Sequence, residues 1–235
     1  MILERLSQIR CRMDAAARRA GRRPDEVSLL AVTKYAPLET VTELLSAGAV
    51  GEIGESRVQD ALRRRRELGA LARKVRWRLI GHLQSNKARL AAESFDSVDS
   101  IDDARTGEAL ERRLAALGKS LPVLVQVKLT ERETQSGVAP GEAPRLVRQL
   151  SFLPSLKVEG LMGIAPAHDS PEAARPAFRR LKQVFDEIFA GRPGARLSMG
   201  MSHDFEVAIE EGATMVRIGA ALFSMANETT TREDK

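Results

Sequence analysis

The chain has 235 residues, 43% of them hydrophobic, and a net charge of +5 at pH 7. This length is enough for one domain with a full core. The only cysteine, Cys11, cannot form an internal disulfide, and no apolar run reaches the roughly 18 residues that a membrane-spanning helix needs. The N-terminus also lacks the basic-then-apolar layout of a signal peptide. We therefore expect a soluble, cytoplasmic protein without a membrane partner.

The excess of basic residues raises the question of nucleic-acid binding. Arginines cluster at 18–19, 22–23 and 63–66, in segments with helical or turn character. The chain has seven Phe, one Trp and one Tyr, and no stacking rings alternate with the basic residues as they do on nucleic-acid-binding surfaces. Solvated helix faces explain these arginines better, so we predict no nucleic-acid partner.

The predicted elements begin with a helix and then alternate between strand and helix. Residues 3–20 have apolar side chains at spacings of three and four, which is typical of an amphipathic helix. The apolar run at 27–32 predicts a strand buried on both faces. Further strands are predicted at 49–53, 76–80, 95–100, 122–128, 157–162, 195–202 and 214–219. Helices are predicted between them at 38–47, 57–68, 85–90, 102–117, 142–150, 171–190 and 204–211, with a short one from 220; Ser85 is placed to cap the helix through Leu90.

About eight strand–helix units after one extra N-terminal helix predict an α/β fold, a single (β/α)8 barrel of the TIM type over residues 1–226. A doubly wound open sheet is the alternative. The first strand–helix turn has no GxGxxG motif, however, and nothing is left over for a second domain. Residues 227–235 are polar without an apolar anchor, which predicts a disordered tail.

Barrel closure would place the last two strands beside the first and join three segments into one candidate site. Lys34 follows the first strand, where a partly desolvated lysine can act as an amine nucleophile, although most lysines in such positions simply reach solvent. The loops after the last two strands often bind phosphate in barrels. Here Gly200 and Gly219 let backbone N–H groups approach an anion, and Ser198 and Ser202 offer hydroxyls. A phosphate beside a lysine amine is the arrangement expected for pyridoxal 5′-phosphate (PLP) bound as a Schiff base.

Each of these residues also has a purely structural interpretation. The glycines could be turn residues, methionines such as Met199 could fill the core, and Ser202 could be a helix N-cap. Arg217 interrupts an otherwise apolar strand, and a buried guanidinium needs an acceptor. A structural carboxylate could be that acceptor as well as a site group.

Five blocks together carry a resemblance to a known family. They are 31–34 (AVTK), 54–60 (GESRVQD), 80–87 (IGHLQSNK), 160–162 (GLM), and 197–202 (LSMGMS) with 216–219 (VRIG). In this order, over about residues 3 to 223, they resemble the signature blocks of the pyridoxal phosphate homeostasis protein family. Members of that family are similar to the N-terminal barrel of bacterial alanine racemase standing alone.

The resemblance implies that PLP is the cofactor, without a metal, and that Lys34 forms the internal aldimine. It also implies that Arg217 faces the pyridine nitrogen, keeps it unprotonated and so weakens the ring as an electron sink. Binding without much catalysis would follow. The cofactor-binding residues that it implies are Lys34, Ser56, Ser198, Met199, Gly200, Arg217, Gly219 and Ala220, with the phosphate held by Ser198 and by the backbone around Gly219 and Ala220.

Two positions depart from the pattern of the family. It usually has Asn in place of Ser56 and Thr in place of Ala220, so one contact beside the ring and one phosphate hydroxyl would be weakened or lost. A hydrogen bond to a charged group contributes about 1.5–3 kcal/mol, so we expect PLP to bind less tightly but still to bind. His82 lies in a matching block, and we interpret it as a cap or loop-packing residue.

Two functions remain open. The first is a non-enzymatic protein of intracellular PLP (vitamin B6) and amino-acid homeostasis, a monomer or weak dimer whose partners are PLP and PLP-dependent apo-enzymes. The second is a PLP-dependent amino-acid racemase. Racemisation needs bases on both faces of the bound cofactor, and alanine racemase takes one of them from a domain that is absent here. Tyr35 is the only tyrosine, and we expect it to point away from the site.

Overall fold

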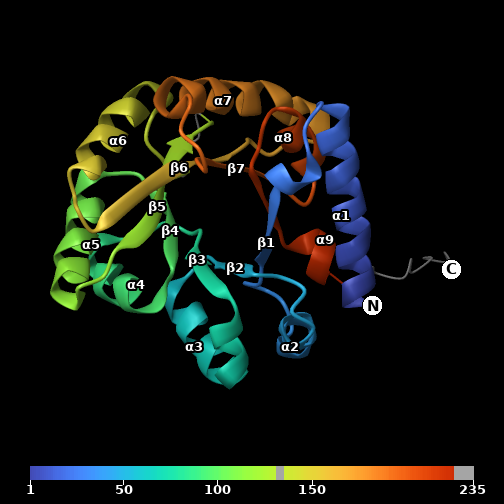
Figure 1. The fold of residues 1–235 in the computed structure, drawn as a ribbon, viewed down its shortest axis with the longest axis horizontal. Helices are drawn as coiled ribbons and strands as arrows, with labels where there is room; N and C mark the ends of the chain where they lie inside the picture. Colours follow the sequence, from blue (N-terminus) through green and yellow to red (C-terminus); the bar gives the residue numbers. More distant parts are fainter. Residues whose placement is uncertain (131–134, 225–235) are drawn as a thin grey trace, which may run out of the picture.

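The computed structural model describes residues 1–130 and 135–224, in which eight strands form a closed parallel barrel in sequence order (Figure 1). The strands are β1 (Ser28–Val32), β2 (Glu52–Glu55), β3 (Arg76–Leu79), β4 (Ser97–Ile101), β5 (Leu121–Lys128), β6 (Leu156–Ile164), β7 (Arg196–Met201) and β8 (Met215–Ile218). Parallel pairing of β8 with β1, with Arg217 opposite Leu30 and Ile218 opposite Ala31, closes the ring. The predicted (β/α)8 barrel is confirmed, and an open sheet is excluded.

Helices surround the barrel, and the first of them precedes the repeating strand–helix units in the sequence (Figure 1). They are α1 (Ile2–Arg19), α2 (Leu38–Ser46), α3 (Val58–Leu68), α4 (Ala88–Ser94), α5 (Ala104–Leu117), α6 (Ala143–Ser151), α7 (Arg175–Phe189), α8 (Phe205–Glu210) and α9 (Ala220–Phe223). The extra helix α1 buries an apolar stripe that includes Leu6, Ile9 and Met13 and lies against α8 and α9. No helix within the described ranges is long and apolar enough to cross a membrane. The tail predicted at 227–235 lies outside the described residues.

Two element predictions were wrong in detail. The second strand was expected at 49–53, but β2 runs from Glu52 to Glu55. Gly54 and Glu55 look like turn residues, yet both are buried. Gly54 is closely packed, since a Cβ there would lie only 3.2 Å from Leu30 Cδ2. Ser85 does not cap a helix: it begins a 3₁₀ turn that ends at Lys87, and α4 follows from Ala88 to Ser94.

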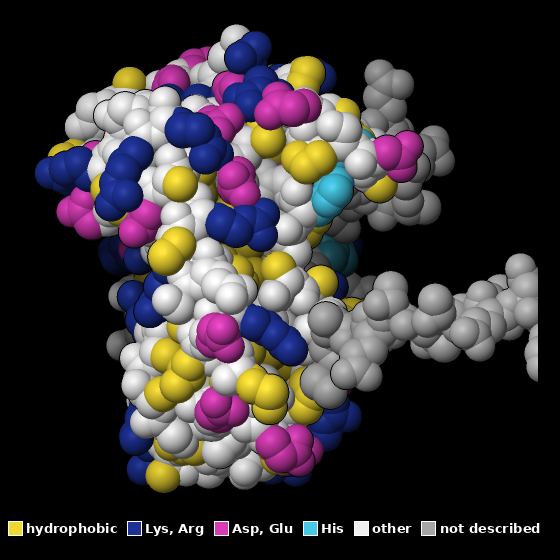
Figure 2. Space-filling model, turned by 90° about the vertical axis from the view of Figure 1, so that its right-hand side faces the viewer, with side chains coloured by type: hydrophobic (Ala, Val, Ile, Leu, Met, Phe, Trp, Pro, Cys, Tyr) yellow, Lys and Arg dark blue, Asp and Glu magenta, His cyan; other side chains and the backbone are white. Residues whose placement is uncertain are grey.

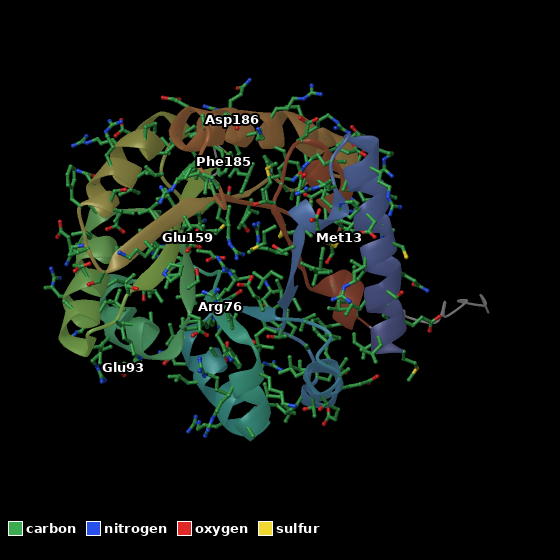
Figure 3. The ribbon with its side chains drawn as sticks, viewed as in Figure 1. Met13, Arg76, Glu93, Glu159, Phe185 and Asp186 are labelled. Atoms are coloured by element: carbon green, nitrogen blue, oxygen red, sulfur yellow. The ribbon has the colours of Figure 1, made fainter. Side chains whose placement is uncertain are left out.

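The floor of the barrel, at the amino ends of the strands, is filled by a network of charged side chains. Arg78 is 1% exposed and donates two hydrogen bonds of 2.8 Å to Asp99. Glu52 accepts from Arg78 at 3.1 Å and from Arg196 at 3.3 Å. In Figure 3, Arg76 and Glu159 lie inside the ring of helices, whereas Glu93 and Asp186 lie on its outer rim. Because these charges are paired at the floor, the opposite end of the barrel is the place for a ligand.

Candidate functional site

The carboxyl ends of β1, β7 and β8 lie side by side at the mouth of the barrel. The register pairs Met201 of β7 with Arg217, and Arg217 with Leu30 of β1. The backbone of Gly219, just beyond β8, touches β1, since a Cβ at Gly219 would lie 3.4 Å from the Cβ of Val32. The structure therefore brings the Lys34 segment and the two glycine-containing loops together.

Lys34 lies in a tight turn directly after β1. Ala36 N donates to Thr33 O at 2.9 Å, so Lys34 and Tyr35 occupy the two central positions of the turn. Lys34 is exposed rather than partly desolvated, and its Nζ lies 5.1 Å from the ring centroid of Tyr35. Tyr35 therefore lies beside the amine instead of pointing away from it, although the residue is 88% exposed. Solvent and small molecules have access to the amine.

Backbone N–H groups from the β8 loop converge on a serine of the β7 loop. Ser202 Oγ accepts from Gly219 N at 3.3 Å and from Ala221 N at 3.0 Å. Gly219 and Ser202 are half-buried and Ala220 is exposed, so the cluster is open to the mouth. Because both N–H groups donate to Ser202 Oγ, the hydroxyl hydrogen of Ser202 is left to donate to an anion such as a phosphate. The closure argument named the Ser202 hydroxyl as a candidate group of this site, whereas the cofactor-binding residues implied by the resemblance did not include it.

Ser198 and Met199 lie deeper than this cluster. Ser198 is fully buried, and its hydroxyl accepts from Arg217 Nη1 at 2.9 Å. Met199 is also fully buried and packs in the apolar core between strands and helices, as the core-filler interpretation expected. Gly200 lies between them and the mouth with a φ of 88°.

Arg217 crosses from β8 beneath the mouth and reaches β7 and, beyond it, β6. Its Nη1 donates to the carbonyl oxygen of Ser198 at 2.9 Å, and its Nη2 donates to Gly163 O at 2.9 Å. These partners are neutral oxygens, and no carboxylate within the described part of the chain forms an ion pair with it. Burial lowers the pKa of Arg217 to about 10, so the guanidinium remains cationic at neutral pH.

Ser56 and His82 lie on the β2 and β3 side of the mouth. Ser56 is half-buried, and its carbonyl oxygen lies only 2.0 Å from the place where a Cβ of Gly81 would stand. His82 Nδ1 lies 3.3 Å from Asp102 Oδ2, and this carboxylate also accepts from Gly137 N at 3.1 Å. Burial raises the pKa of Asp102. These contacts agree with the interpretation of His82 as a loop-packing residue.

A cavity of about 530 Å³ opens beside the β6 and β7 loops. His168, His203 and Asp204 contribute to its wall, and His168 Nε2 lies 3.4 Å from Asp204 Oδ2. Its volume is in the range of small-molecule sites. The sequence interpretation did not single out these histidines, because neither lies in a recognisable spacing. Within the described ranges, no group of three or more His, Cys, Asp or Glu side chains is arranged to hold a metal ion.

The fold and this mouth define a class of protein: a (β/α)8 barrel that presents a lysine, converging N–H groups and a buried arginine at the carboxyl ends of its strands. Residues 5–227 match the family model of the alanine racemase N-terminal domain. The pyridoxal phosphate homeostasis protein of Aquifex aeolicus is 39% identical over 222 residues, which cover 94% of this chain and 96% of that protein. Its counterpart in Escherichia coli K12 is 40% identical over 233 residues, which cover 94% and 95%. The chain therefore belongs to the alanine racemase N-terminal domain family and, within it, to the pyridoxal phosphate homeostasis proteins.

Solved structures agree with this assignment. PipY of Synechococcus elongatus with PLP bound superimposes with a TM-score of 0.80 at 34% identity, covering 95% of this chain and all of that one. PipY without PLP gives a TM-score of 0.82 at 36% identity. Alanine racemase of Clostridium difficile shares the fold at 17% identity with a TM-score of 0.67, and the match covers 54% of that longer chain.

Proposed function

We propose that this protein binds PLP at the mouth of its barrel, as a Schiff base on Lys34, and acts in intracellular PLP and amino-acid homeostasis without robust catalysis. The observation that carries the proposal is the closure of β8 on β1. It places the exposed Lys34 two residues beyond Val32, against which Gly219 packs. The relatives named pyridoxal phosphate homeostasis protein and the PLP-bound PipY support the same ligand.

The residues at the mouth fit both the aldehyde group and the phosphate group of PLP. The cofactor supplies an aldehyde; the nitrogen of Lys34 forms a C=N bond to its carbon, and the aldehyde oxygen leaves as water. We assign the phosphate to the Ser202 hydroxyl, whose oxygen accepts from the N–H groups of Gly219 and Ala221 and whose hydrogen is therefore left to donate to the phosphate. Ser198 is then a partner of Arg217 rather than a direct phosphate ligand.

The remaining predicted residues shape the site or pack around it in this proposal. Gly200 and Ala220 shape the two loops, Met199 packs beneath them, and Ser56 lies beside the ring. We take residues 1–226 as one PLP-binding domain and the cytoplasm as its compartment. The departures at Ser56 and Ala220 lower the affinity for PLP without abolishing it.

Arg217 is the group that argues against efficient turnover. A guanidinium donates hydrogen bonds but accepts none, so beside the pyridine nitrogen it favours the unprotonated ring. An unprotonated ring withdraws electrons poorly, and carbanion chemistry at the bound amine is then slow. We therefore favour binding over racemisation, although the enzymes that share this fold include a racemase.

The test is an absorption spectrum of the purified protein with added PLP, followed by borohydride reduction and peptide mass spectrometry. We expect the long-wavelength band of lysine-linked PLP in the wild type, its loss in Lys34→Ala, and its retention in Lys128→Ala, a control at the end of β5. An unchanged band in Lys34→Ala would overturn the assignment of the lysine. Measurable racemisation of L-alanine would overturn the non-enzymatic role and favour the racemase.

Delivery of the cofactor is the second part of the role. We propose PLP-dependent apo-enzymes as recipients and a monomer or weak dimer as the delivering form. Mixing the loaded protein with an apo-aminotransferase should restore that enzyme's activity faster than PLP lost from the protein into solution can do. A rate that equals spontaneous release would show that no direct transfer occurs, and sedimentation velocity would report the oligomeric state.

A further inference from the structure

A buried ion pair lies directly behind the turn that carries Lys34. Glu55, the last residue of β2, has a fully buried side chain, and Arg64 of α3 has a side chain that is 10% exposed. Arg64 Nε lies 3.0 Å from Glu55 Oε1. The pair faces the helix layer, on the side of the sheet away from the barrel interior, so it does not touch a ligand in the mouth.

This pair holds both ends of the Lys34 turn. The hydroxyl of Thr33, just before Lys34, donates to Glu55 Oε1 at 2.5 Å. The guanidinium of Arg64 donates through Nη1 to the carbonyl oxygen of Ala36 at 3.1 Å. Thr33 and Ala36 are buried, whereas the two residues between them are exposed. One ion pair therefore fixes the two buried ends of a turn whose exposed middle carries the amine.

Stability alone is a weak reason for such a pair. A buried ion pair is often no more stabilising than apolar residues of similar volume, because removing charges from water offsets their attraction. Here the cost is visible, since Glu55 Oε2 has no hydrogen-bond partner in the described part of the chain. Burial also raises the pKa of Glu55, although the Thr33 hydroxyl and Arg64 oppose that shift.

We propose that Glu55 and Arg64 are positioning residues that hold the Lys34 turn so that its amine meets the aldehyde of PLP. This inference rests on the proposed function. Bond formation between bound groups depends steeply on their placement, and a displacement of about 1 Å can lower a rate by about a hundredfold. A turn tied at both ends also has less backbone freedom to lose when the amine reacts.

The first test separates positioning from stability by replacing the whole pair with apolar residues, Glu55→Leu with Arg64→Met. We expect the denaturant midpoint to fall only moderately, because no charge is left unpaired, although the Thr33 hydroxyl and the Ala36 carbonyl lose these partners. The rate constant for capture of PLP should nevertheless fall at least about tenfold. After borohydride reduction, the share of PLP on Lys34 relative to the other lysines should fall as well, which a purely structural role would not cause.

A matched control removes another arginine that holds backbone carbonyls far from Lys34. Arg22 donates to Ile209 O at 2.9 Å and to Ala213 O at 2.8 Å, near the amino end of β8. Arg22→Met should lower the denaturant midpoint and leave both the capture rate and the share on Lys34 unchanged.

If the double variant does not fold, a second variant tests whether the pair positions the Lys34 turn. Thr33→Val keeps the shape of the side chain and the ion pair but removes the hydroxyl that ties Thr33 to Glu55. We expect its capture rate to fall at least about threefold, a smaller loss than for the double variant because one of the two ties remains.

Wild-type capture rates and a wild-type share on Lys34 in every variant that folds would overturn the positioning role and leave the proposed function standing. A wild type that captures no PLP on Lys34 would overturn both.

Discussion

Gly200 lets the β7 loop pack directly on the helix that follows it. Its φ is +88°, and a Cβ at this position would lie 2.4 Å from the Cβ of Ala208 and 3.1 Å from the Cα of Phe205. Both the backbone conformation and the lack of space therefore require glycine. Because Ser202 follows two residues later, Gly200 also sets where the serine meets the β8 loop.

Gly200→Ala should lower the free energy of unfolding by about 2–4 kcal/mol, the sum of left-handed backbone strain and overpacking against α8. Urea denaturation measures this change. Gly51→Ala is the control, because a Cβ there would meet no atom within 4 Å. We expect the control to be neutral or slightly stabilising. Equal stabilities of the two variants would contradict the packing argument.

At the scale of elements, charged side chains join the first helix to the last part of the barrel. Arg175, at the start of α7, lies 2.8 Å from Glu210 and 2.7 Å from Glu211. Arg19 of α1 reaches Glu210 at 2.8 Å and Glu206 at 3.0 Å. These contacts connect α1, α7 and α8 across the outer surface. Figure 2 shows the same mixture of basic and acidic side chains over the face that it presents.

Arg175→Met should lower the free energy of unfolding by about 1–2 kcal/mol at pH 7, because the network is only partly shielded from water. Burial favours a higher pKa for Glu210, but hydrogen bonds from Arg175 and Arg19 outweigh it and hold the pKa below the ordinary value. A carboxyl with a lowered folded-state pKa contributes stability above its unfolded pKa and loses it as the pH falls through the folded value. The difference between wild type and variant should therefore shrink below about pH 4.

Arg89→Met supplies the comparison for this measurement, since Arg89 is 58% exposed and forms only a 3.4 Å pair with Glu93 in α4. We expect a change within about 0.5 kcal/mol at every pH. A pH-independent loss in Arg175→Met would show that lost packing, not charge, explains its effect.

The sequence predicted most strands to within about two residues but misplaced β2. β5 and β8 lie within a residue of their predicted bounds, because most of their side chains are apolar. β2 was misplaced because Glu55 is buried by partners at positions 33 and 64, which no local pattern contains. The same limit applies to the contacts of Ser202, whose hydroxyl was a candidate but whose partners in the β8 loop are 17 and 19 residues away.

At the scale of the whole molecule, barrel closure was predictable from the count of strand–helix units, but the depth of each site residue was not. Lys34, Gly219 and Arg217 lie around the mouth as the closure argument expected. The burial of Ser198 in β7 depends on how Arg217 reaches from β8 past β7 to Gly163 in β6. That reach depends on the register between β7 and β8. A single sequence specifies the order of strands more clearly than their register.

The basic charge of the chain is also explained by the assembled molecule. In the arginine run at 63–66, Arg64 is buried against Glu55, and the guanidinium of Arg65 lies 5.0 Å from the ring centroid of Trp77. Arg63 pairs within its own helix. In a run that looks like a basic patch in the sequence, two of the four arginines are therefore paired with carboxylates, although the pI is about 9.7.

Duplex DNA should consequently bind this protein only weakly, with a dissociation constant in the nonspecific range of about 10⁻⁴–10⁻⁶ M at physiological salt. Fluorescence anisotropy of a labelled duplex at several salt concentrations measures this. Glu206→Gln with Glu210→Gln removes partners of Arg12, Arg19 and Arg175, and should strengthen binding at low salt if pairing is what neutralises these arginines. Nanomolar binding by the wild type, with a steep salt dependence, would instead mean that the basic residues form a nucleic-acid surface despite their acidic partners.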